Sequence, residues 1–388
     1  MIYLDNAATT FPKPTTVVEE VRKCMQTYGG NPGRGAHSLS LAAAKKVFEC
    51  RSELADMFGA ADTDRVFFTP NTTYGINAVL KGLLRQGDHV IISDMEHNAV
   101  WRPVCKLAAE GRITYDVFPT FTCDPKRTPQ RICAAISRLI RPNTKMVFCT
   151  HASNICSVVL PVAQIGELCR RRGILFATDG AQMAGHENID VGKMNISALC
   201  IPGHKGLYGP QGSGAVILGE GVVLDTIIEG GNGVDSLDAD MSLTAPERYE
   251  AGTVSTPAIA GLCEGIRAVR KTGVDNISHE EKRICARLYE ILGNTRGAHL
   301  YAPEYAGEGS IVLFGIDGVP SERVASALDQ RGVCVRGGYH CAALAHNTLG
   351  TAEGGAVRLS AGMYTKMSDT DGFYRAIRGV VKELVPTE

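Results

Sequence analysis

The sequence of 388 residues lacks several features that mark common protein classes. It has no run of about 18 apolar residues, and its start lacks the charged and apolar regions of a signal peptide. It has no excess of positive charge, because 40 Lys and Arg residues stand against 41 Asp and Glu residues. Nucleic-acid binding therefore has no electrostatic support. We expect a soluble cytoplasmic protein with neither a membrane nor a nucleic-acid partner.

The sequence also lacks a C-x-x-C pair, although it contains 13 cysteines. An odd number of scattered cysteines argues against a disulfide framework and against a zinc ribbon, so we predict no metal site. Most of the cysteines are expected to be small buried residues, such as Cys149, Cys169 and Cys200.

The length exceeds that of a typical single core, so two domains are expected. Short apolar runs alternate with helical patterns from about residue 60 to 220. This alternation predicts an α/β fold with a mostly parallel sheet covered on both faces. After residue 255 the pattern changes to that of a smaller α+β unit. We predict a large domain over 16–255 and a small domain built from 1–15 and 256–388. The strands expected in the large domain cover 65–68, 89–93, 145–148, 174–177 and 214–218.

The most informative motif is Gly203-His204-Lys205-Gly206, which follows Asp179 by 26 residues. Taken alone, a glycine-flanked lysine is more typical of a surface loop. Pyridoxal phosphate (PLP), however, needs a lysine amine for its aldehyde and an aspartate that keeps its ring nitrogen protonated. Asp179 ends a predicted strand, where ligands of parallel sheets bind. The pair therefore predicts a PLP site.

Two further motifs follow predicted strands. Asn71-Thr72-Thr73 opens a helix, and such a terminus with free N–H groups and hydroxyls suits an anion. It can also be a plain helix cap, but a PLP enzyme needs a seat for the phosphate of this kind. His97 follows the next strand, where it either stacks on a pyridine ring or caps the following helix.

Cys341 lies in the glycine-rich segment Arg336 to Ala342, beside an arginine and a histidine. Thiolates are favoured near positive charge and react only when accessible. We therefore predict a reactive cysteine, the alternative being one more buried thiol. Arg358 follows in a predicted strand and either binds a carboxylate bidentately or forms a structural ion pair.

Seven motifs occur along the chain in one order. They are Tyr3 to Thr10, Glu96-His97, Ser153-Asn154, Asp179 to Gln182, Gly203 to Lys205, Gly252-Thr253, and His340-Cys341 with Arg358. In this order they resemble the cysteine desulfurases, which belong to the class V aminotransferase group of fold-type I PLP enzymes. The short stretch between Cys341 and Arg358 is similar to the SUF-type (group II) branch, which includes selenocysteine lyases. The resemblance covers essentially the whole chain and implies a fold-type I PLP-dependent transferase with a seven-stranded sheet.

The resemblance implies roles for individual residues. Lys205 would form the Schiff base and move protons at the substrate α-carbon, while Cys341 would attack the substrate sulfur and keep it as a persulfide. The residues expected to hold PLP are Asp179 at the ring nitrogen, His97 on the ring, Gln182 at the phenolic oxygen, Asn154, and Thr72, Thr73, His204 and another subunit's Thr253 at the phosphate. The residues expected to bind the substrate are Asn154, Arg358, Asn6 and Ala7.

One position departs from the family pattern. The residue two places before the His-Lys pair usually carries a hydroxyl for the phosphate, and here it is Pro202, which has neither hydroxyl nor N–H. Either cofactor affinity is weaker or another donor such as Thr72 substitutes.

The predicted function is that of a homodimeric L-cysteine desulfurase. It would supply sulfur to an acceptor or scaffold protein for iron–sulfur clusters or thiolated cofactors. Three alternatives remain open at the level of sequence. They are a selenocysteine lyase, which need not use Cys341, another class V aminotransferase or lyase, and a non-enzymatic interaction module.

Overall fold

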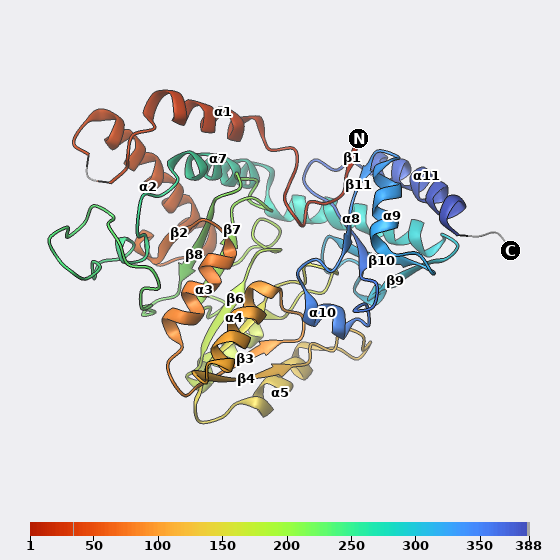
Figure 1. Ribbon diagram of the computed structural model, residues 1–388, viewed down its shortest axis with the longest axis horizontal. Coiled ribbons are helices and arrows are strands. Elements are labelled where there is room, and N and C mark those ends of the chain that lie inside the picture. The colour runs from red at the N-terminus through yellow and green to blue at the C-terminus, as the bar shows by residue number, and fades with distance from the viewer. Residues whose placement is uncertain (34, 386–388) are drawn as a thin grey trace.

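The structure is a computed structural model and describes residues 1–33 and 35–385 (Figure 1). Its larger sheet has seven strands in the order β2-β8-β7-β6-β5-β3-β4. β8 runs antiparallel to both of its neighbours, and the other neighbouring pairs are parallel. The prediction of a mostly parallel, seven-stranded sheet is confirmed. The strands are β2 (Val66–Thr69), β3 (Asp88–Ser93), β4 (Ile113–Phe118), β5 (Thr144–Thr150), β6 (Leu175–Asp179), β7 (Ala198–Pro202) and β8 (Gly214–Leu218).

Helices cover both faces of this sheet, because its strands are apolar on both sides. In β3, Val90 and Ile92 belong to one core and Ile91 belongs to the other, as the alternation of side chains in a strand requires. The first core is closed by α3 (Thr72–Leu83) and α4 (Asn98–Ala109). The second is closed by α2 (Ser38–Phe58), α5 (Pro129–Leu139), α6 (Val162–Arg172) and α7 (Thr256–Thr272).

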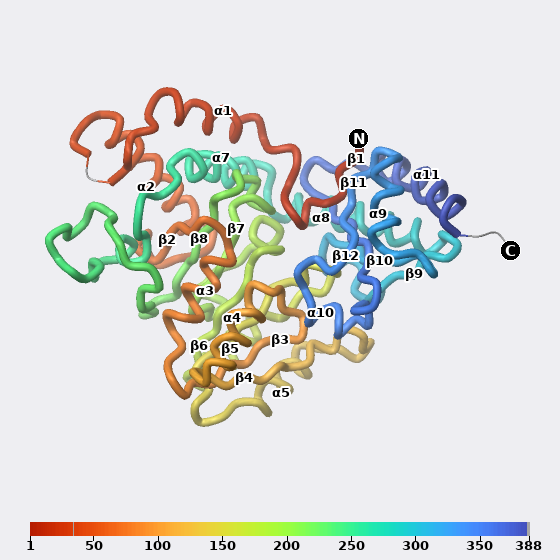
Figure 2. The backbone as a smooth tube through the Cα atoms, in the orientation of Figure 1, coloured from red at the N-terminus to blue at the C-terminus, as the bar shows by residue number. Residues whose placement is uncertain are grey.

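A second, antiparallel sheet lies in the C-terminal part, with the order β12-β13-β10-β9 (Figure 2). Leu288, Phe314, Leu359 and Phe373 are among the side chains of its core. The N-terminal strand β1 (Ile2–Tyr3) pairs in parallel with β11 (Val333–Cys334), so the first residues lie beside this sheet. The other elements of this part are α8 (Val274–Gly293), β9 (Ala298–Tyr301), β10 (Ile311–Ile316), α9 (Ser321–Asp329), β12 (Arg336–Gly338), α10 (Ala343–Thr348), β13 (Ala356–Ser360) and α11 (Met367–Leu384).

The remaining helical segments are short or lie at the N-terminus. They are α1 (Thr15–Lys23), a π-helical turn (Cys24–Tyr28) and the 3-10 turns Thr63–Arg65, Glu247–Tyr249 and Pro303–Tyr305. Within residues 1–33 and 35–385, no helix is both long and apolar enough to cross a lipid bilayer.

The helix α7 follows the expected domain boundary at residue 255, which stays a prediction. It packs against α1 and α2, and the three helices lie together in Figure 1. The physical reason is its apolar face, since Ile259, Leu262 and Ile266 are buried in the core of the seven-stranded sheet.

Candidate functional site

A cavity of about 170 Å³ lies where β6 and β7 end and where α3 and α4 begin. Ligands of parallel sheets bind at this edge, because the carboxyl ends of the strands and the following helix N-termini meet there. The structure brings eight of the predicted site residues together in its wall. The lining residues are Asn71, Thr72, Thr73, His97, Ala99, Thr150, Asn154, Asp179, Ala181, Gln182, Pro202, His204 and Lys205.

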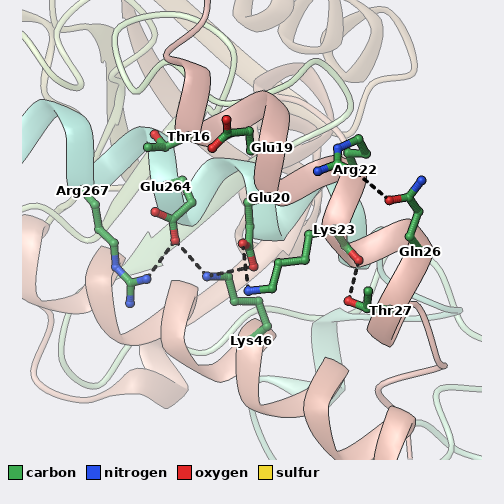
Figure 3. A pocket seen from close by; sticks show the side chains of 10 residues that line it. All are labelled: Thr16, Glu19, Glu20, Arg22, Lys23, Gln26, Thr27, Lys46, Glu264 and Arg267. Carbon is green, nitrogen blue, oxygen red and sulfur yellow. Dashed lines mark hydrogen bonds and ion pairs between the residues drawn. The ribbon is translucent and has the colours of Figure 1, made fainter.

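A larger hollow of about 690 Å³ lies on the outer surface, between α1, α2 and α7 (Figure 3). Several of its charged groups are already paired with one another. Lys46 Nζ lies 2.9 Å from Glu264 Oε1 and 3.4 Å from Glu20 Oε1, and Arg267 Nη1 lies 2.9 Å from Glu264 Oε1. Because these ion pairs occupy several of the charged groups of the hollow, we regard the smaller cavity, which contains Lys205 and Asp179, as the candidate site.

Lys205 follows β7, and the peptide before it is firmly held. The His204 carbonyl oxygen accepts hydrogen bonds from Thr10 N at 3.1 Å, Thr9 Oγ1 at 3.1 Å and Lys13 Nζ at 2.7 Å. Burial lowers the pKa of Lys205 to about 8, and although the Asp179 carboxylate opposes this shift, the Arg358 and Arg336 charges add to it. A lowered pKa increases the fraction of neutral amine, which is the nucleophilic form.

Asp179 is the last residue of β6 and is 4% exposed. Its side chain accepts a hydrogen bond from Ala181 N at 2.9 Å, and no other hydrogen bond to it is present among the described residues. Burial raises its pKa, and the Lys205 charge works against that shift. A buried carboxyl group in a cavity wall with one neutral donor suits a cationic N–H from a ligand.

The N-terminus of α3 offers unused donors to the same cavity. Asn71 caps the helix, since its Oδ1 accepts a hydrogen bond from Tyr74 N at 3.0 Å. Thr72 Oγ1 is buried and has no hydrogen-bond partner in the described part of the chain. The cap and the anion seat are therefore separate residues, and an anion such as a phosphate would satisfy the free N–H groups and the Thr72 hydroxyl. Pro202 lies in the same wall and adds no donor.

His97 combines both interpretations that the sequence left open. Its Nδ1 accepts a hydrogen bond from Ala99 N at 3.0 Å as the cap of α4, and its side chain also lines the cavity. Burial lowers its pKa to about 4, and the positive charges of Lys205 and Arg336 contribute. The ring is therefore neutral, with its proton on Nε2 because Nδ1 acts as an acceptor.

The structure shows how two of the predicted substrate residues, Arg358 and Asn154, are engaged within the chain. Arg358 is 2% exposed, and its Nη2 and Nη1 are engaged by Asp5 Oδ1 and by the Asn154 carbonyl oxygen, both at 2.8 Å. Its Nε has no hydrogen-bond partner in the described part of the chain. The two Nη atoms are thus both occupied and cannot bind a carboxylate bidentately. Asn154 Nδ2 donates to the His340 carbonyl at 2.8 Å, which leaves the acceptor Oδ1 unpaired. Asn154 is therefore suited to receive a donor and not to bind a carboxylate.

Asn6 and Ala7 do not line the cavity. The Asn6 amide is used up by backbone groups, since Nδ2 donates to Tyr3 O and Ser360 O while Oδ1 accepts from Phe11 N. The role of Asn6 in substrate binding therefore stays a prediction, and these bonds leave its amide no free group. Ala7 is one contact away from the cavity, because its carbonyl accepts a hydrogen bond from Gln182 Nε2 at 3.2 Å.

Cys341 is one of two exposed cysteines among the 13 free ones, the other being Cys123. It lies between β12 and α10 and outside the cavity wall. The Cys341 carbonyl oxygen accepts a hydrogen bond from Asn98 N at 2.7 Å, which places it next to His97 in the cavity wall. The His340 ring does not supply a positive charge beside the Cys341 thiol. His340 is buried, and burial lowers its pKa to about 3, so the ring is neutral.

Thr253 is not brought to this cavity within one chain. It is exposed and lines a different hollow of about 430 Å³, and Asn31 Nδ2 donates a hydrogen bond to its Oγ1 at 3.5 Å. Any contact with a bound phosphate therefore requires a second subunit.

Two residues near the site were missed at the level of sequence. Lys13 anchors the His204 carbonyl, and burial lowers its pKa to about 8. Glu96 is fully buried, and its Oε1 accepts hydrogen bonds from Thr150 N at 2.9 Å and Ser93 N at 3.3 Å. Glu96 stood within a recognised motif, but its complete burial is a tertiary property that the motif does not show.

We expect the Glu96→Gln variant to lose part of the pH dependence of stability. Burial raises the pKa of Glu96 from its ordinary 4.5 to about 8, and nearby Asp179 adds to the shift. Between these values the folded protein holds a proton that the unfolded chain releases, so this group makes stability fall as pH rises. Thermal unfolding from about pH 5 to pH 8 should show a smaller decrease of Tm, by several degrees, in Glu96→Gln than in wild type. The exposed Glu353→Gln change is the control, and an equally steep decrease in Glu96→Gln would contradict the assignment.

Comparison with known proteins was made by sequence and by structure. The family model described as Aminotransferase class-V matches residues 2–373. A protein of Methanothermobacter thermautotrophicus named "Probable cysteine desulfurase" is 32% identical over 372 residues, covering 94% of this chain and 90% of that protein. A Pyrococcus abyssi protein with the same name is 31% identical over 399 residues, covering 99% and 95%.

Two solved structures have the same fold. The apo structure of a cysteine desulfurase from Thermococcus onnurineus superposes with a TM-score of 0.88 at 30% identity, and the match covers 99% of this chain and 95% of that one. A cysteine desulfurase from Escherichia coli superposes with a TM-score of 0.86 and the same coverage. At 24% identity this second likeness supports the fold alone.

Proposed function

The chain belongs to the class V aminotransferase family and to its cysteine desulfurases, and from this premise we propose that it removes sulfur from L-cysteine and holds it on Cys341. The observation that carries this proposal is one connected arrangement. Lys205 and Asp179 share a cavity wall with His97, and the backbone beside His97 is hydrogen-bonded to Cys341. The Lys205 amine, which can react with a cofactor aldehyde, and the accessible Cys341 thiol are therefore linked through the cavity wall at His97 and the adjacent backbone hydrogen bond.

The residues of the cavity fit PLP. Lys205 offers a partly neutral amine for the aldehyde, the buried Asp179 suits the ring N–H, and His97 offers a neutral ring beside it. The phosphate would be held by the N-terminus of α3, where the unpaired Thr72 hydroxyl supplies the donor that Pro202 lacks. When bound, PLP supplies an electron sink that acidifies the substrate α-carbon. The other proposed ligands are Thr73, His204, Gln182 and, through its unpaired Oδ1, Asn154.

Lys205 and Arg358 act on the α-carbon and the carboxylate of the substrate. The Lys205 amine can take and return a proton near neutral pH, because its pKa is lowered to about 8. The Arg358 Nε–H is a buried donor without a partner, and a substrate carboxylate would satisfy it while Asp5 keeps the guanidinium in place.

Cys341 takes the sulfur. A new S–S bond forms between the Cys341 thiol and the substrate sulfur while the substrate C–S bond breaks, and a proton replaces sulfur on the former β-carbon. L-cysteine and the thiol thus become L-alanine and a persulfide, with no external oxidant or reductant. The exposure of Cys341 supports onward transfer to an acceptor or scaffold protein. Because the 13 cysteines are all unpaired, we place this activity in the reducing cytoplasm.

We also propose that the active unit is a two-fold dimer. α2 exposes Leu39, Leu41 and Phe48, by 48%, 59% and 58%. Phe48 and Thr253 line the same hollow, and the segment before Thr253 projects beside α2 in Figure 1. A second copy covering this surface would bring its Thr253 to the neighbouring phosphate seat. An apolar surface of this kind is unusual for a monomer.

Mixing two inactive variants tests the dimer. We expect Lys205→Ala and Thr253→Ala each to be inactive alone, and their mixture to regain about a quarter of wild-type activity. This estimate follows because half of randomly formed dimers are hybrids and one site in each is complete. The measurement is alanine formation after the subunits have exchanged. Exchange without regained activity, or a fully active monomer, would contradict the proposal.

The function itself is tested with purified holoenzyme and L-cysteine. Alanine should form in amounts equal to the sulfide released by reductant, with little pyruvate. Rapid turnover of L-selenocysteine with no turnover of L-cysteine would instead establish a selenocysteine lyase. Exchange of the amino group with a keto acid would establish an aminotransferase.

A further inference from the structure

Two histidines lie beneath the loop that carries Cys341. His340 directly precedes the cysteine, and His346 belongs to α10. Both side chains are buried, with exposed fractions of 4% and 1%. Their rings meet edge to edge and are nearly coplanar, with centroids 5.5 Å apart and planes inclined by 11°. His340 Nδ1 lies 3.3 Å from His346 Nε2.

The hydrogen-bond partners of these rings support one assignment of their protons. His340 Nε2 lies 3.1 Å from the Arg336 carbonyl oxygen, which can only accept, so this nitrogen carries the hydrogen. The His340 Nδ1 is then an acceptor and takes the hydrogen of His346 Nε2. The His346 Nδ1 is in turn an acceptor and faces Thr351 Oγ1 at 2.6 Å, so the hydroxyl donates. The result is one series of hydrogen bonds, in which Thr351 donates to His346, His346 donates to His340, and His340 donates to the backbone of β12.

Both rings are held neutral. Burial lowers the pKa of His340 to about 3, and the Arg358 and Arg336 charges oppose protonation as well. Burial also lowers the pKa of His346. The donors and acceptors in this series of hydrogen bonds therefore stay the same across the neutral pH range. The two histidines support the loop as neutral side chains.

The two residues of the supported loop, His340 and Cys341, have an unfavourable backbone conformation. His340 and Cys341 have φ angles of 52° and 56°, a region that residues with a Cβ atom rarely adopt. Hydrogen bonds from Asn154 Nδ2 to His340 O at 2.8 Å and from Asn98 N to Cys341 O at 2.7 Å hold its carbonyls. The His340 ring adds a third anchor, which ties the segment to β12 and α10. Such a conformation persists when its surroundings determine it at several points.

We propose that His346 and Thr351 are positioning residues for Cys341: through His340 they fix the backbone of the cysteine relative to Asn98 and Asn154 and so present its thiol to the substrate sulfur. The reaction step in this proposal rests on the proposed desulfurase function. The hydrogen bonds that hold the backbone of Cys341 are independent of that function. Neither residue touches the cavity, and both act through His340.

Paired substitutions separate positioning from packing. Thr351→Val keeps the shape of the side chain but loses the donor, whereas Thr351→Ser keeps the donor. His346→Gln can still accept from Thr351 and donate to His340, whereas His346→Leu can do neither. We expect Thr351→Val and His346→Leu to load sulfur onto Cys341 about 10-fold more slowly in a single turnover, with KM little changed. Thr351→Ser and His346→Gln should stay within about 3-fold of wild type. A purely packing role predicts the opposite order.

Two measurements keep the test independent of the reaction. Ring ¹⁵N NMR of the wild-type holoenzyme should show His340 and His346 neutral and protonated at Nε2. The rate of alkylation of Cys341 by iodoacetamide, read by mass spectrometry, should change in Thr351→Val and His346→Leu but not in the paired variants. Wild-type rates in all four variants, or a ring that is charged or protonated at Nδ1, would overturn the proposal. If wild type loads no sulfur, the proposed function fails, while NMR and alkylation still decide the positioning role.

Discussion

The Lys205→Ala variant is expected to be colourless and inactive. Of the described residues that line the cavity, Lys205 is the one with an amine, so no other side chain there can bind the cofactor aldehyde. The same amine moves protons at the substrate α-carbon, a contribution commonly worth about 10²- to 10⁴-fold in rate. Activity should therefore fall by about 10³-fold or more, and the visible absorption of the protein with added PLP should be that of the free cofactor.

Lys13 provides a matched control for this prediction. It is a second half-buried lysine with a pKa lowered to about 8, and its Nζ contacts the His204 carbonyl at 2.7 Å, yet it does not line the cavity. Lys13→Met should retain the visible band when saturated with PLP. Borohydride reduction of wild type should attach the cofactor to the peptide of Lys205. Attachment to the Lys13 peptide, or a coloured and active Lys205→Ala protein, would remove the assignment.

The sequence predicts the fold best where side-chain chemistry alone determines a strand. β3 and β8 are rich in β-branched residues, and 89–93 and 214–218 were expected as strands. β4 and β7 were not expected. β7 (Ala198–Pro202) has Ala, Leu and Cys at its first positions and a terminal proline, and it becomes a strand because β6 and β8 bury it from both sides. β4 is the edge strand and is partly exposed, so its apolar pattern is weak.

The meeting of the site residues was predictable for a similar reason. Asp179, His97 and Lys205 follow strands of one parallel sheet, and the carboxyl ends of such strands share an edge. The hydrogen-bond partners of individual side-chain atoms were not predictable. Asp5 occupies one arm of Arg358 because segments far apart in the sequence pack side by side, and His346 supports His340 because the turn between β12 and α10 brings the two rings together. Contacts of this kind leave no signal in local spacing. The SUF-type branch and the individual roles of the site residues remain predictions.

The second large effect is expected for Cys341→Ala. This variant should bind PLP and L-cysteine as wild type does, because Cys341 lies outside the cavity wall. It should release no sulfide above background, a loss of at least about 10²-fold, since the described cavity wall itself contains no thiol that could accept the sulfur in place of Cys341. L-selenocysteine can still be cleaved by this variant, because selenium departs without capture by a thiol.

Cys123→Ala is the matched control, since Cys123 is the other exposed cysteine. It should desulfurate L-cysteine at close to the wild-type rate. The two variants differ in which exposed thiol is lost, so a general effect of removing a surface cysteine would appear in both. Loss of activity in Cys123→Ala with full activity in Cys341→Ala would exchange the roles of the two residues.

The most direct test of the central claim is mass spectrometry of the wild-type holoenzyme after L-cysteine, without reductant. The account predicts that the peptide carrying Cys341 gains the mass of one sulfur atom, that the peptides of the other 12 of the 13 cysteines do not, and that alanine appears in equal amount. Alanine formed with no sulfur on Cys341, or sulfur found first on another cysteine, would contradict it.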